Sequence, residues 1–246
     1  MKILKKTHWF ANRKKFDIDC FELLEPQRLV NENSRGKTGT FYSVKCKRHI
    51  QYESRLELNF FESLEISPEV LFYWEQPVKI QYRLSTGKKI SYFPDAGIYL
   101  KSKEFILVEI KELPAMLENY VQKKIEGLMH FCSKKGFGLL LTDGKHTIDV
   151  IKKYQTNKKL EKAILNAIQD YRVITRSEYK SIMKDSDGTQ KELLKIVHKN
   201  DLKFGPRGCR LMRNNKNQIF RHVFIEHKPY EEIYSFLFHS NELGLR

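Results

Sequence analysis

The sequence predicts an α/β protein with two units, residues 1–150 and residues 151–246. Residues 1–150 show the order helix, three strands, helix, strand, which is typical of an α/β core. Residues 151–246 show further helical patterns followed by a basic strand pattern, which favours a second unit. With 246 residues, 41% of them hydrophobic, the chain is long and apolar enough to build a core in each unit.

The net charge of +15 is unevenly distributed along the chain. Residues 1–50 carry a net charge of +7, residues 51–150 a net charge of −1, and residues 151–246 a net charge of +9. A near-neutral middle between basic segments favours a protein that holds a polyanion at its edges. Nucleic acid is the expected polyanion, because phosphate contacts supply most of the sequence-independent affinity; a solvated Lys-rich surface is the alternative.

The first predicted helix follows Tyr52. Apolar residues recur there at helical spacing and form one stripe: Leu56, Phe60, Phe61 and Leu64. Pro68 ends the helix. Glu53 and Glu57 are four residues apart and therefore lie on one face, one turn above the other.

Three strands are predicted next, over residues 78–84, 90–100 and 105–111. The turns between them are expected at residues 85–88 and 101–103. Pro114 then opens a helix whose predicted apolar face comprises Met116, Leu117, Tyr120, Val121, Ile125, Leu128 and Met129. A buried strand over residues 137–141 completes the core. The acidic residues of this core are expected to meet near the centre of the sheet.

One predicted hairpin brings two carboxylates and an ammonium group together. It places Asp95 and Glu109 at neighbouring strand ends, and Lys111 shares a face with Glu109 because alternate residues of a strand do. These groups suit a hard divalent cation and an activated water. Two other Glu-x-Lys tripeptides, at residues 178–180 and 226–228, do not follow an apolar strand. Alternatively, Asp95 is a surface acid and Glu109 forms a cross-strand ion pair.

In the second unit, Thr175 and Thr189 each begin a capping box with a Glu three residues later. Residues 210–223 are predicted to form two strands around a turn at 214–217. Two helices and a basic hairpin resemble a winged helix, in which the second helix and the hairpin can meet DNA. The candidate DNA contacts are Lys191, Lys195, Arg210, Arg213 and Lys216. The alternative is an appendage that binds a protein partner or packs on the core.

Several short segments together resemble a known family. Pro94-Asp95 with Glu109-x-Lys111 is similar to the PD-(D/E)XK nuclease signature. More narrowly, five segments occur in the order seen in the N-terminal domain of TnsA, the endonuclease subunit of heteromeric transposases: Tyr52-Glu53-Ser54-x-x-Glu57, Ser67-Pro68-Glu69-Val70, Glu75-Gln76-Pro77, Pro94-Asp95 and Val108-Glu109-Ile110-Lys111. The resemblance covers residues 40–150. The apolar residue that usually follows Pro-Asp is replaced by Ala96-Gly97.

This resemblance implies a restriction-endonuclease-like core, with a mixed central sheet flanked by helices, and a C-terminal winged-helix-like domain. It also implies roles for the site residues. Asp95 and Glu109 would ligate Mg²⁺, with the carbonyl of Ile110 as a further ligand, and Mn²⁺ is expected to substitute. Lys111 would position or help deprotonate the attacking water.

Residues on the two flanking helices would complete the site. Glu57 would reach a second ion or its water, and it is favoured over Glu53 because the family pattern places the acid at the later position. The helix after the hairpin would contact phosphate near the site through Gln122, Lys123 and Lys124, although a solvated helix face is the alternative for these three residues.

These observations predict a Mg²⁺-dependent DNA endonuclease. By the resemblance, it would cut the 5′ ends of a transposon in double-stranded DNA, with a TnsB-like transposase that joins the 3′ ends and a TnsC-like AAA+ regulator as partners. The alternatives are a stand-alone restriction-like or phage nuclease and a non-catalytic DNA-binding subunit with this fold. No apolar run approaches the roughly 18–20 residues of a membrane span, so we expect no membrane partner and a cytoplasmic, nucleoid-associated place in a bacterium.

Overall fold

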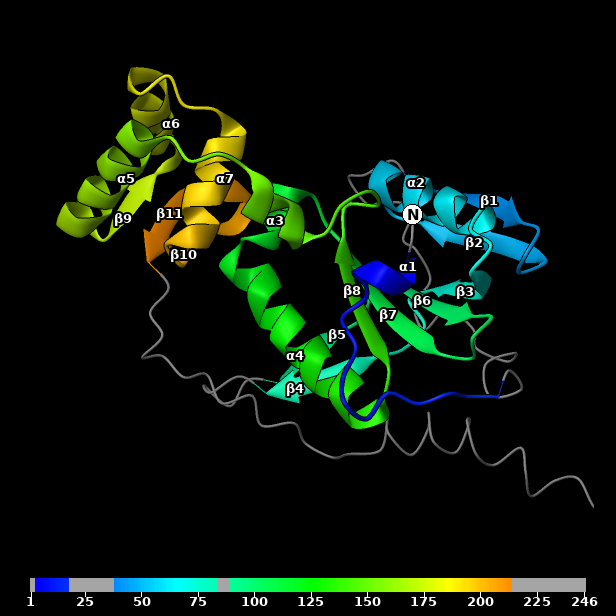
Figure 1. Ribbon diagram of the computed structural model, residues 1–246. Coiled ribbons are helices and arrows are strands. Elements are labelled where there is room, and N and C mark those ends of the chain that lie inside the picture. Colours follow the sequence, from blue (N-terminus) through cyan, green and yellow to red (C-terminus); the bar gives the residue numbers. More distant parts are fainter. Residues whose placement is uncertain (1–2, 18–37, 84–88, 214–246) are drawn as a thin grey trace, which may run out of the picture. The chain divides into compact units, whose positions relative to one another are not determined.

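The computed structural model describes residues 3–17, 38–83 and 89–213, and these form two compact units (Figure 1). The first unit contains residues 3–110 and Gly127–Lys145, and the second contains Lys111–Glu126 and residues 146–213. This division differs from the predicted one at residue 150, because residues 111–126 and 146–150 lie in the second unit.

A four-stranded mixed sheet forms the centre of the first unit, with the strand order β3-β6-β7-β8. The strand β6 is antiparallel to both of its neighbours, β3 and β7, whereas β7 and β8 are parallel. The prediction of a mixed central sheet with helices is confirmed. Two smaller sheets, β1-β2 and β4-β5, accompany it. The strands are β1 Gly39–Ser43, β2 Arg48–Tyr52, β3 Val70–Glu75, β4 Ile80–Arg83, β5 Lys89–Tyr92, β6 Ala96–Leu100, β7 Phe105–Ile110 and β8 Gly138–Thr142.

The strand predicted over residues 90–100 is in fact two strands in different sheets. Its first part, β5, pairs with β4, whereas β6 lies in the central sheet between β3 and β7. The chain breaks between them at Pro94, which has no amide hydrogen to donate to a ladder. The strand β3 was not predicted, yet it is the neighbour of β6. The predicted turn at 85–88 lies outside the described residues.

The helix α2, Arg55–Glu65, forms as its sequence pattern predicts. Ser54 is its N-cap and accepts a hydrogen bond from the amide of Glu57 at 3.1 Å. Phe60, Phe61 and Leu64 are fully buried in one cluster with the central strands. This packing attaches the start of α2, with Glu53 and Glu57, to the sheet.

The β1-β2 hairpin is attached to the far end of α2. The Lys45 ammonium donates to carbonyl oxygens of Leu64 at 2.8 Å and Val70 at 2.9 Å, and also to that of Ser67. It therefore supplies donors to carbonyl groups at and just beyond the helix C-terminus. The carboxylate of Glu65 accepts hydrogen bonds from the hydroxyl groups of Ser43 and Tyr73.

Glu65 gives the first unit a measurable dependence on pH. Partial burial raises the pKa of this carboxyl, but the hydrogen bonds and the nearby Lys45 outweigh burial, so the net pKa is lowered. Stability from Glu65 is therefore present above the ordinary carboxyl pKa and lost as the pH falls through the lowered one. We expect Glu65→Gln to have a lower free energy of unfolding than wild type near neutral pH, and we expect this difference to shrink in acid. Unfolding by urea at several pH values measures it. Exposed Glu62→Gln is the control; a pH-independent difference would contradict this assignment.

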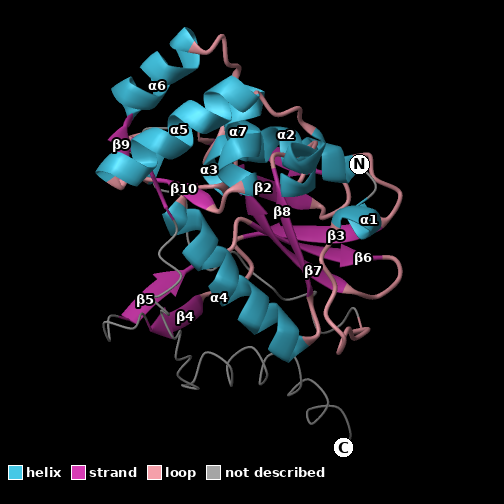
Figure 2. Ribbon diagram, turned by 60° about the vertical axis from the view of Figure 1, so that its left-hand side comes forward, coloured by secondary structure: helices cyan, strands magenta, loops and turns pink. Residues whose placement is uncertain are grey.

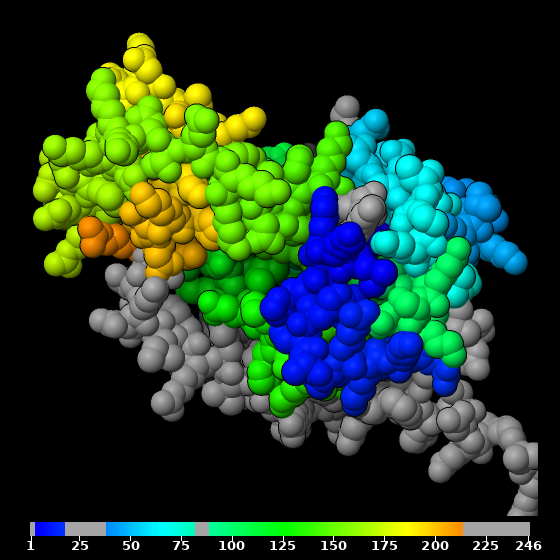
Figure 3. Space-filling model, viewed as in Figure 1, coloured from blue at the N-terminus to red at the C-terminus, as the bar shows by residue number. Residues whose placement is uncertain are grey.

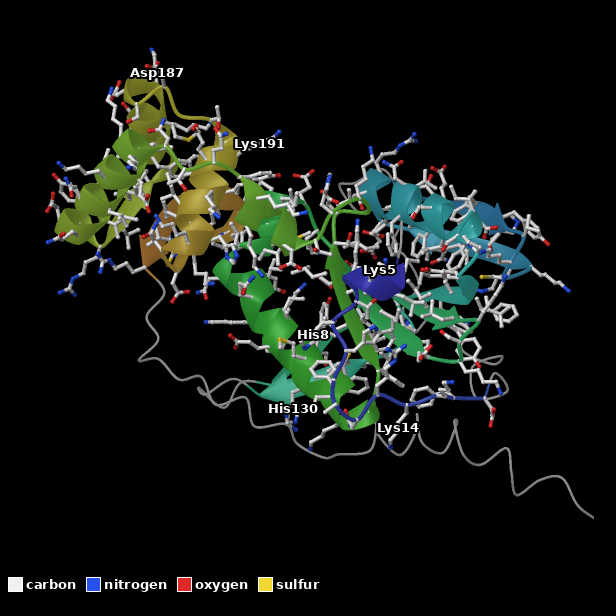
Figure 4. All side chains as sticks on the ribbon, in the orientation of Figure 1. Lys5, His8, Lys14, His130, Asp187 and Lys191 are labelled. Atoms are coloured by element: carbon white, nitrogen blue, oxygen red, sulfur yellow. The ribbon has the colours of Figure 1, made fainter. Side chains whose placement is uncertain are left out.

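The N-terminal segment is part of the first unit, although the family resemblance does not cover it. It begins with the short helix α1, Ile3–Lys6. The backbone of His8 then exchanges two hydrogen bonds with that of Leu139 on β8, at 2.8 and 2.9 Å. Arg13 pairs with the buried carboxylate of Glu104 and lies 3.8 Å from the centre of the Trp9 ring. This segment, blue in Figure 3, forms one continuous strip of surface, and Figure 4 labels His8 on it.

The single helix predicted from Pro114 is two helices, α3 Leu113–Met116 and α4 Asn119–Lys135. The break falls where the carbonyl of Leu117 accepts a hydrogen bond from the amide of Phe204 at 3.0 Å. The predicted apolar face was wrong at two positions, because Tyr120 is 57% and Met129 39% exposed. None of the helices within the described ranges is long and apolar enough to cross a membrane.

The second unit combines helices, cyan in Figure 2, with a three-stranded antiparallel sheet of order β10-β11-β9. The predicted partner of residues 210–213 was wrong: β11 pairs with β10 on one side and β9 on the other, and the predicted turn at 214–217 lies outside the described residues. Both capping boxes are confirmed. The elements are η2 Ile148–Lys153, α5 Lys158–Tyr171, β9 Val173–Thr175, α6 Arg176–Asp185, α7 Gln190–Lys199, β10 Leu202–Phe204, η3 Pro206–Gly208 and β11 Arg210–Arg213.

Candidate active site

Asp95 directly precedes β6, and Glu109 lies near the end of β7, the neighbouring middle strand of the central sheet. The β6-β7 register pairs Ala96 with Val108, so the next pair outward is Asp95 with Glu109. On the other side, the amide of Gln76 donates to the carbonyl of Asp95 at 3.2 Å, and Glu109 is in register with Leu141 of β8. The two acids thus stand in one row across the sheet.

The two carboxylates have different surroundings. One oxygen of Asp95, Oδ2, accepts a hydrogen bond from the amide of Ile110 at 2.7 Å, which ties the acid to the end of β7. Glu109 is fully buried, at 0% exposure. A buried carboxylate in the middle of a sheet is costly unless a cation or hydrogen-bond donors compensate it.

The donor groups at this place have the chemistry that Mg²⁺ prefers. Two carboxylates on neighbouring strands and the carbonyl of Ile110 are all oxygen ligands. Lys111 follows directly after β7, which ends at Ile110, and the predicted shared face of Lys111 and Glu109 stays a prediction. Over the described ranges, no group of three or more His, Cys, Asp and Glu side chains is arranged to hold a metal ion. The ligation of a metal ion by Asp95, Glu109, the carbonyl of Ile110 and Glu57 therefore stays a prediction.

The carboxylate of Glu57 accepts two hydrogen bonds at the start of α2. Its Oε2 accepts from the amide of Glu53 at 2.8 Å, and its Oε1 accepts from the hydroxyl of Ser54 at 2.9 Å. The carboxylate of Glu53 accepts from the side-chain amide of Gln76 at 3.3 Å. Gln76 therefore connects the side chain of Glu53 to the backbone of Asp95. The metal role of Glu57 stays a prediction.

Variants of Glu57 separate its two roles. Glu57→Gln keeps an acceptor for the cap but removes the charge that a metal ion needs, whereas Glu57→Ala removes both and costs about 1 kcal/mol of stability. If Glu57 serves the metal, Glu57→Gln loses DNA cleavage at least about tenfold while its urea midpoint stays near that of wild type. Exposed Glu62→Gln on the same helix is the control. Full activity in Glu57→Gln would leave Glu57 as a cap only.

Gln76 is a site residue to which the sequence pattern assigned no role. It is 8% exposed, has a left-handed φ of 44°, and joins the backbone of Asp95 to the side chain of Glu53. Its Oε1 has no hydrogen-bond partner among the described residues. Glu75, next to it, is buried and binds Arg48 through two hydrogen bonds. The segment Glu75-Gln76-Pro77 belongs to the TnsA resemblance, and this was the only signal of its importance.

The predicted DNA contacts lie in several places. On α4, the side chain of Gln122 donates to the carbonyl of Met116, and Lys124 lies 4.8 Å from the Tyr120 ring centre; Lys123 is on the same helix. Lys191 and Lys195 are on α7, and Figure 4 labels Lys191. Arg210 and Arg213 begin and end β11, and Lys216 lies outside the described residues. All of these DNA contacts stay predictions.

The mixed sheet with helices and the paired acids on its middle strands are consistent with a nuclease fold. The family model described as "TnsA-like endonuclease N terminal" matches residues 67–164, a range that contains Asp95, Glu109 and Lys111. The resemblance to TnsA is thereby confirmed, and residues 67–164 are similar to the TnsA-like endonuclease N-terminal family. Glu57 precedes the matched range. No curated protein matches the chain.

Proposed function

We propose that this protein is a Mg²⁺-dependent DNA endonuclease that hydrolyses phosphodiester bonds at transposon 5′ ends. The family match supports a nuclease of the transposase type. The observation that carries the proposal is the pairing of Asp95 with Glu109 on the two middle strands, directly before Lys111. Because the pairing of β6 with β7 fixes their register, the sheet itself positions the two acids.

Each residue of the site would have a distinct task. Asp95, Glu109 and the carbonyl of Ile110 would hold the ion, which would supply positive charge for the phosphate and an acidified water. The hydrogen bond from the amide of Ile110 would keep the Asp95 carboxylate in one orientation. The Lys111 ammonium would orient the attacking water and offset negative charge on the phosphate.

We further propose that the second unit is a winged-helix-like domain. Its order of elements, α5, β9, α6, α7, β10 and β11, and its three-stranded antiparallel sheet support this assignment. In the transposase setting, the chain would act on transposon ends together with a TnsB-like transposase and a TnsC-like AAA+ regulator. The second unit would then bind DNA or one of these partners.

A cleavage assay tests the proposal and its alternatives. Supercoiled DNA that carries transposon ends is incubated with Mg²⁺ and the full chain, with and without a partner transposase. The proposal expects cuts at the 5′ ends in the complete mixture. Strong cutting of any naked DNA by the chain alone would favour a stand-alone nuclease. Absence of cutting in every mixture, although the chain binds DNA, would favour a non-catalytic subunit.

A further inference from the structure

Three basic side chains line one face of α6 at four-residue spacing: Arg176, Lys180 and Lys184. We call them the α6 stripe. Residues four apart on a helix are surface neighbours. All three side chains are exposed, and within the described part of the chain none of them forms an ion pair. Figure 3 shows α6 in yellow, with side chains that project from the surface of its unit.

The α6 stripe is unfavourable unless something binds to it. Like charges at a spacing of four residues repel and destabilise a helix. The two exposed acids of α6 do not relieve this repulsion. At about 100° per residue, Glu178 and Asp185 lie at the other edge of the exposed face, and Glu178 is held in the capping box with Thr175. An anionic partner along the stripe would remove the repulsion.

The buried side of α6 holds the stripe in place. Tyr179 is 6% exposed, and its hydroxyl donates to the carbonyl of Gly208 at 2.7 Å in the turn before β11. The amide of Arg176 donates to the carbonyl of Cys209 at 2.9 Å. Because α6 is fixed to this turn, the spacing of the three cations is set by the fold and not by partner binding.

A fourth cation extends the same surface. Arg210 is exposed and is in register with Thr175, the N-cap of α6, and opposite residues in an antiparallel pair point to the same side of the sheet. Ile174 and Leu211, the next pair, are buried on the other side. The α6 stripe and Arg210 therefore form one row of positive charge over a helix and an adjoining strand end.

By contrast, the basic side chains of α7 are used within the unit. Lys195 donates to the carbonyl of Lys152 in η2 at 2.6 Å, and Lys199 pairs with Glu161 of α5 at 2.9 Å. Leu193, Leu194, Ile196 and Val197 are buried, so α7 is a core helix. It packs against both η2 and α5. In the helix that a winged-helix pattern would present to DNA, the apolar face thus packs within the unit, and Lys195 and Lys199 are bound to neighbouring segments.

We propose that α6, and not α7, is the DNA-binding helix of the second unit, and that the α6 stripe and Arg210 contact the phosphates of duplex DNA. Exposed cations at helical spacing suit the sugar–phosphate backbone and give affinity without sequence preference. The proposal rests on the proposed function as a nuclease that acts on DNA, and it adds which surface holds the substrate.

The test compares three variants of the full chain. One removes the α6 stripe (Arg176→Gln, Lys180→Gln, Lys184→Gln), and one removes the α7 charges (Lys191→Gln, Lys195→Gln). A matched control removes three exposed cations elsewhere in the second unit: Lys153→Gln, Lys158→Gln and Lys162→Gln. Binding to a random-sequence DNA duplex is measured by fluorescence anisotropy over a range of salt, in EDTA so that cleavage plays no part.

The α6-stripe variant is expected to bind DNA at least about tenfold more weakly, with a log K against log [salt] slope about 2–3 units shallower. The control and α7 variants should stay near wild type. An equal loss of DNA affinity in the control would show that net charge alone, and not the position of the α6 stripe, determines binding. Wild-type binding by the α6-stripe variant would overturn the proposal. Failure of nuclease function is distinguishable, because Asp95→Asn should lose cleavage yet keep the wild-type salt slope.

Discussion

Asp95→Asn and Glu109→Gln are each expected to lower Mg²⁺-dependent DNA cleavage by about 10²–10³-fold while the protein stays folded. Both replacements keep the shape of the side chain. In Asp95→Asn, the new side chain retains an oxygen that accepts the Ile110 amide hydrogen bond. In Glu109→Gln, a neutral amide is cheaper to bury than the carboxylate it replaces. What each variant loses is the charge that would hold the ion.

The matched control for these variants is Glu178→Gln, because Glu178 also begins a Glu-x-Lys tripeptide but caps a helix in the second unit. Cleavage is measured at saturating DNA, and unfolding by urea shows that all chains are folded. The control should cleave at the wild-type rate. Wild-type rates in both site variants would refute the site, and a loss in the control would show that the assay responds to any change of charge.

Arg48→Ala is expected to destabilise the first unit by about 3 kcal/mol. Arg48 holds the buried carboxylate of Glu75 by two hydrogen bonds, at 2.9 and 2.7 Å, and so connects β2 to β3. Without the guanidinium group, Glu75 keeps the amide of Gln51 as a donor but loses its counter-charge. Because Gln76 follows Glu75 and its amide binds the carbonyl of Asp95, a displacement of Glu75 should also displace Asp95.

Unfolding by urea measures this loss, with exposed Arg55→Ala as the control, which should change stability by less than about 0.5 kcal/mol. The double variant Arg48→Ala, Glu75→Gln should recover part of the loss, because it no longer buries an uncompensated charge. If Arg48→Ala were as stable as the control, the Arg48–Glu75 pair would contribute no more to the free energy of unfolding than a surface ion pair does.

The proximity of Asp95 to the end of β7 was predictable because it depends on short-range rules. Asp95 directly precedes β6, Glu109 lies in β7, and a short turn joins these two strands, so their register brings the two residues together. The capping boxes at Thr175 and Thr189 follow from contacts three residues apart. Where the controlling contact is local, the sequence pattern and the structure agree.

Features that depend on distant contacts were missed. The break between α3 and α4 depends on Phe204, which is 87 residues from Leu117. The partner of Arg210–Arg213 was misassigned because two strands earlier in the chain already flank it. The hydrogen bond from Lys195 to the carbonyl of Lys152 in η2 likewise leaves no periodic signal in the sequence. Tertiary packing overrides local propensity at these positions.

The central claim is that Asp95 and Glu109 hold the ion for DNA cleavage. The most direct test is a crystal of the full chain soaked in Mn²⁺, with anomalous diffraction recorded for wild type and for Asp95→Asn. We expect an anomalous peak beside the Asp95 and Glu109 carboxylates and the Ile110 carbonyl in wild type, and its loss in the variant. A wild-type crystal saturated with Mn²⁺ that shows no peak there, or an equal peak in both crystals, would contradict it.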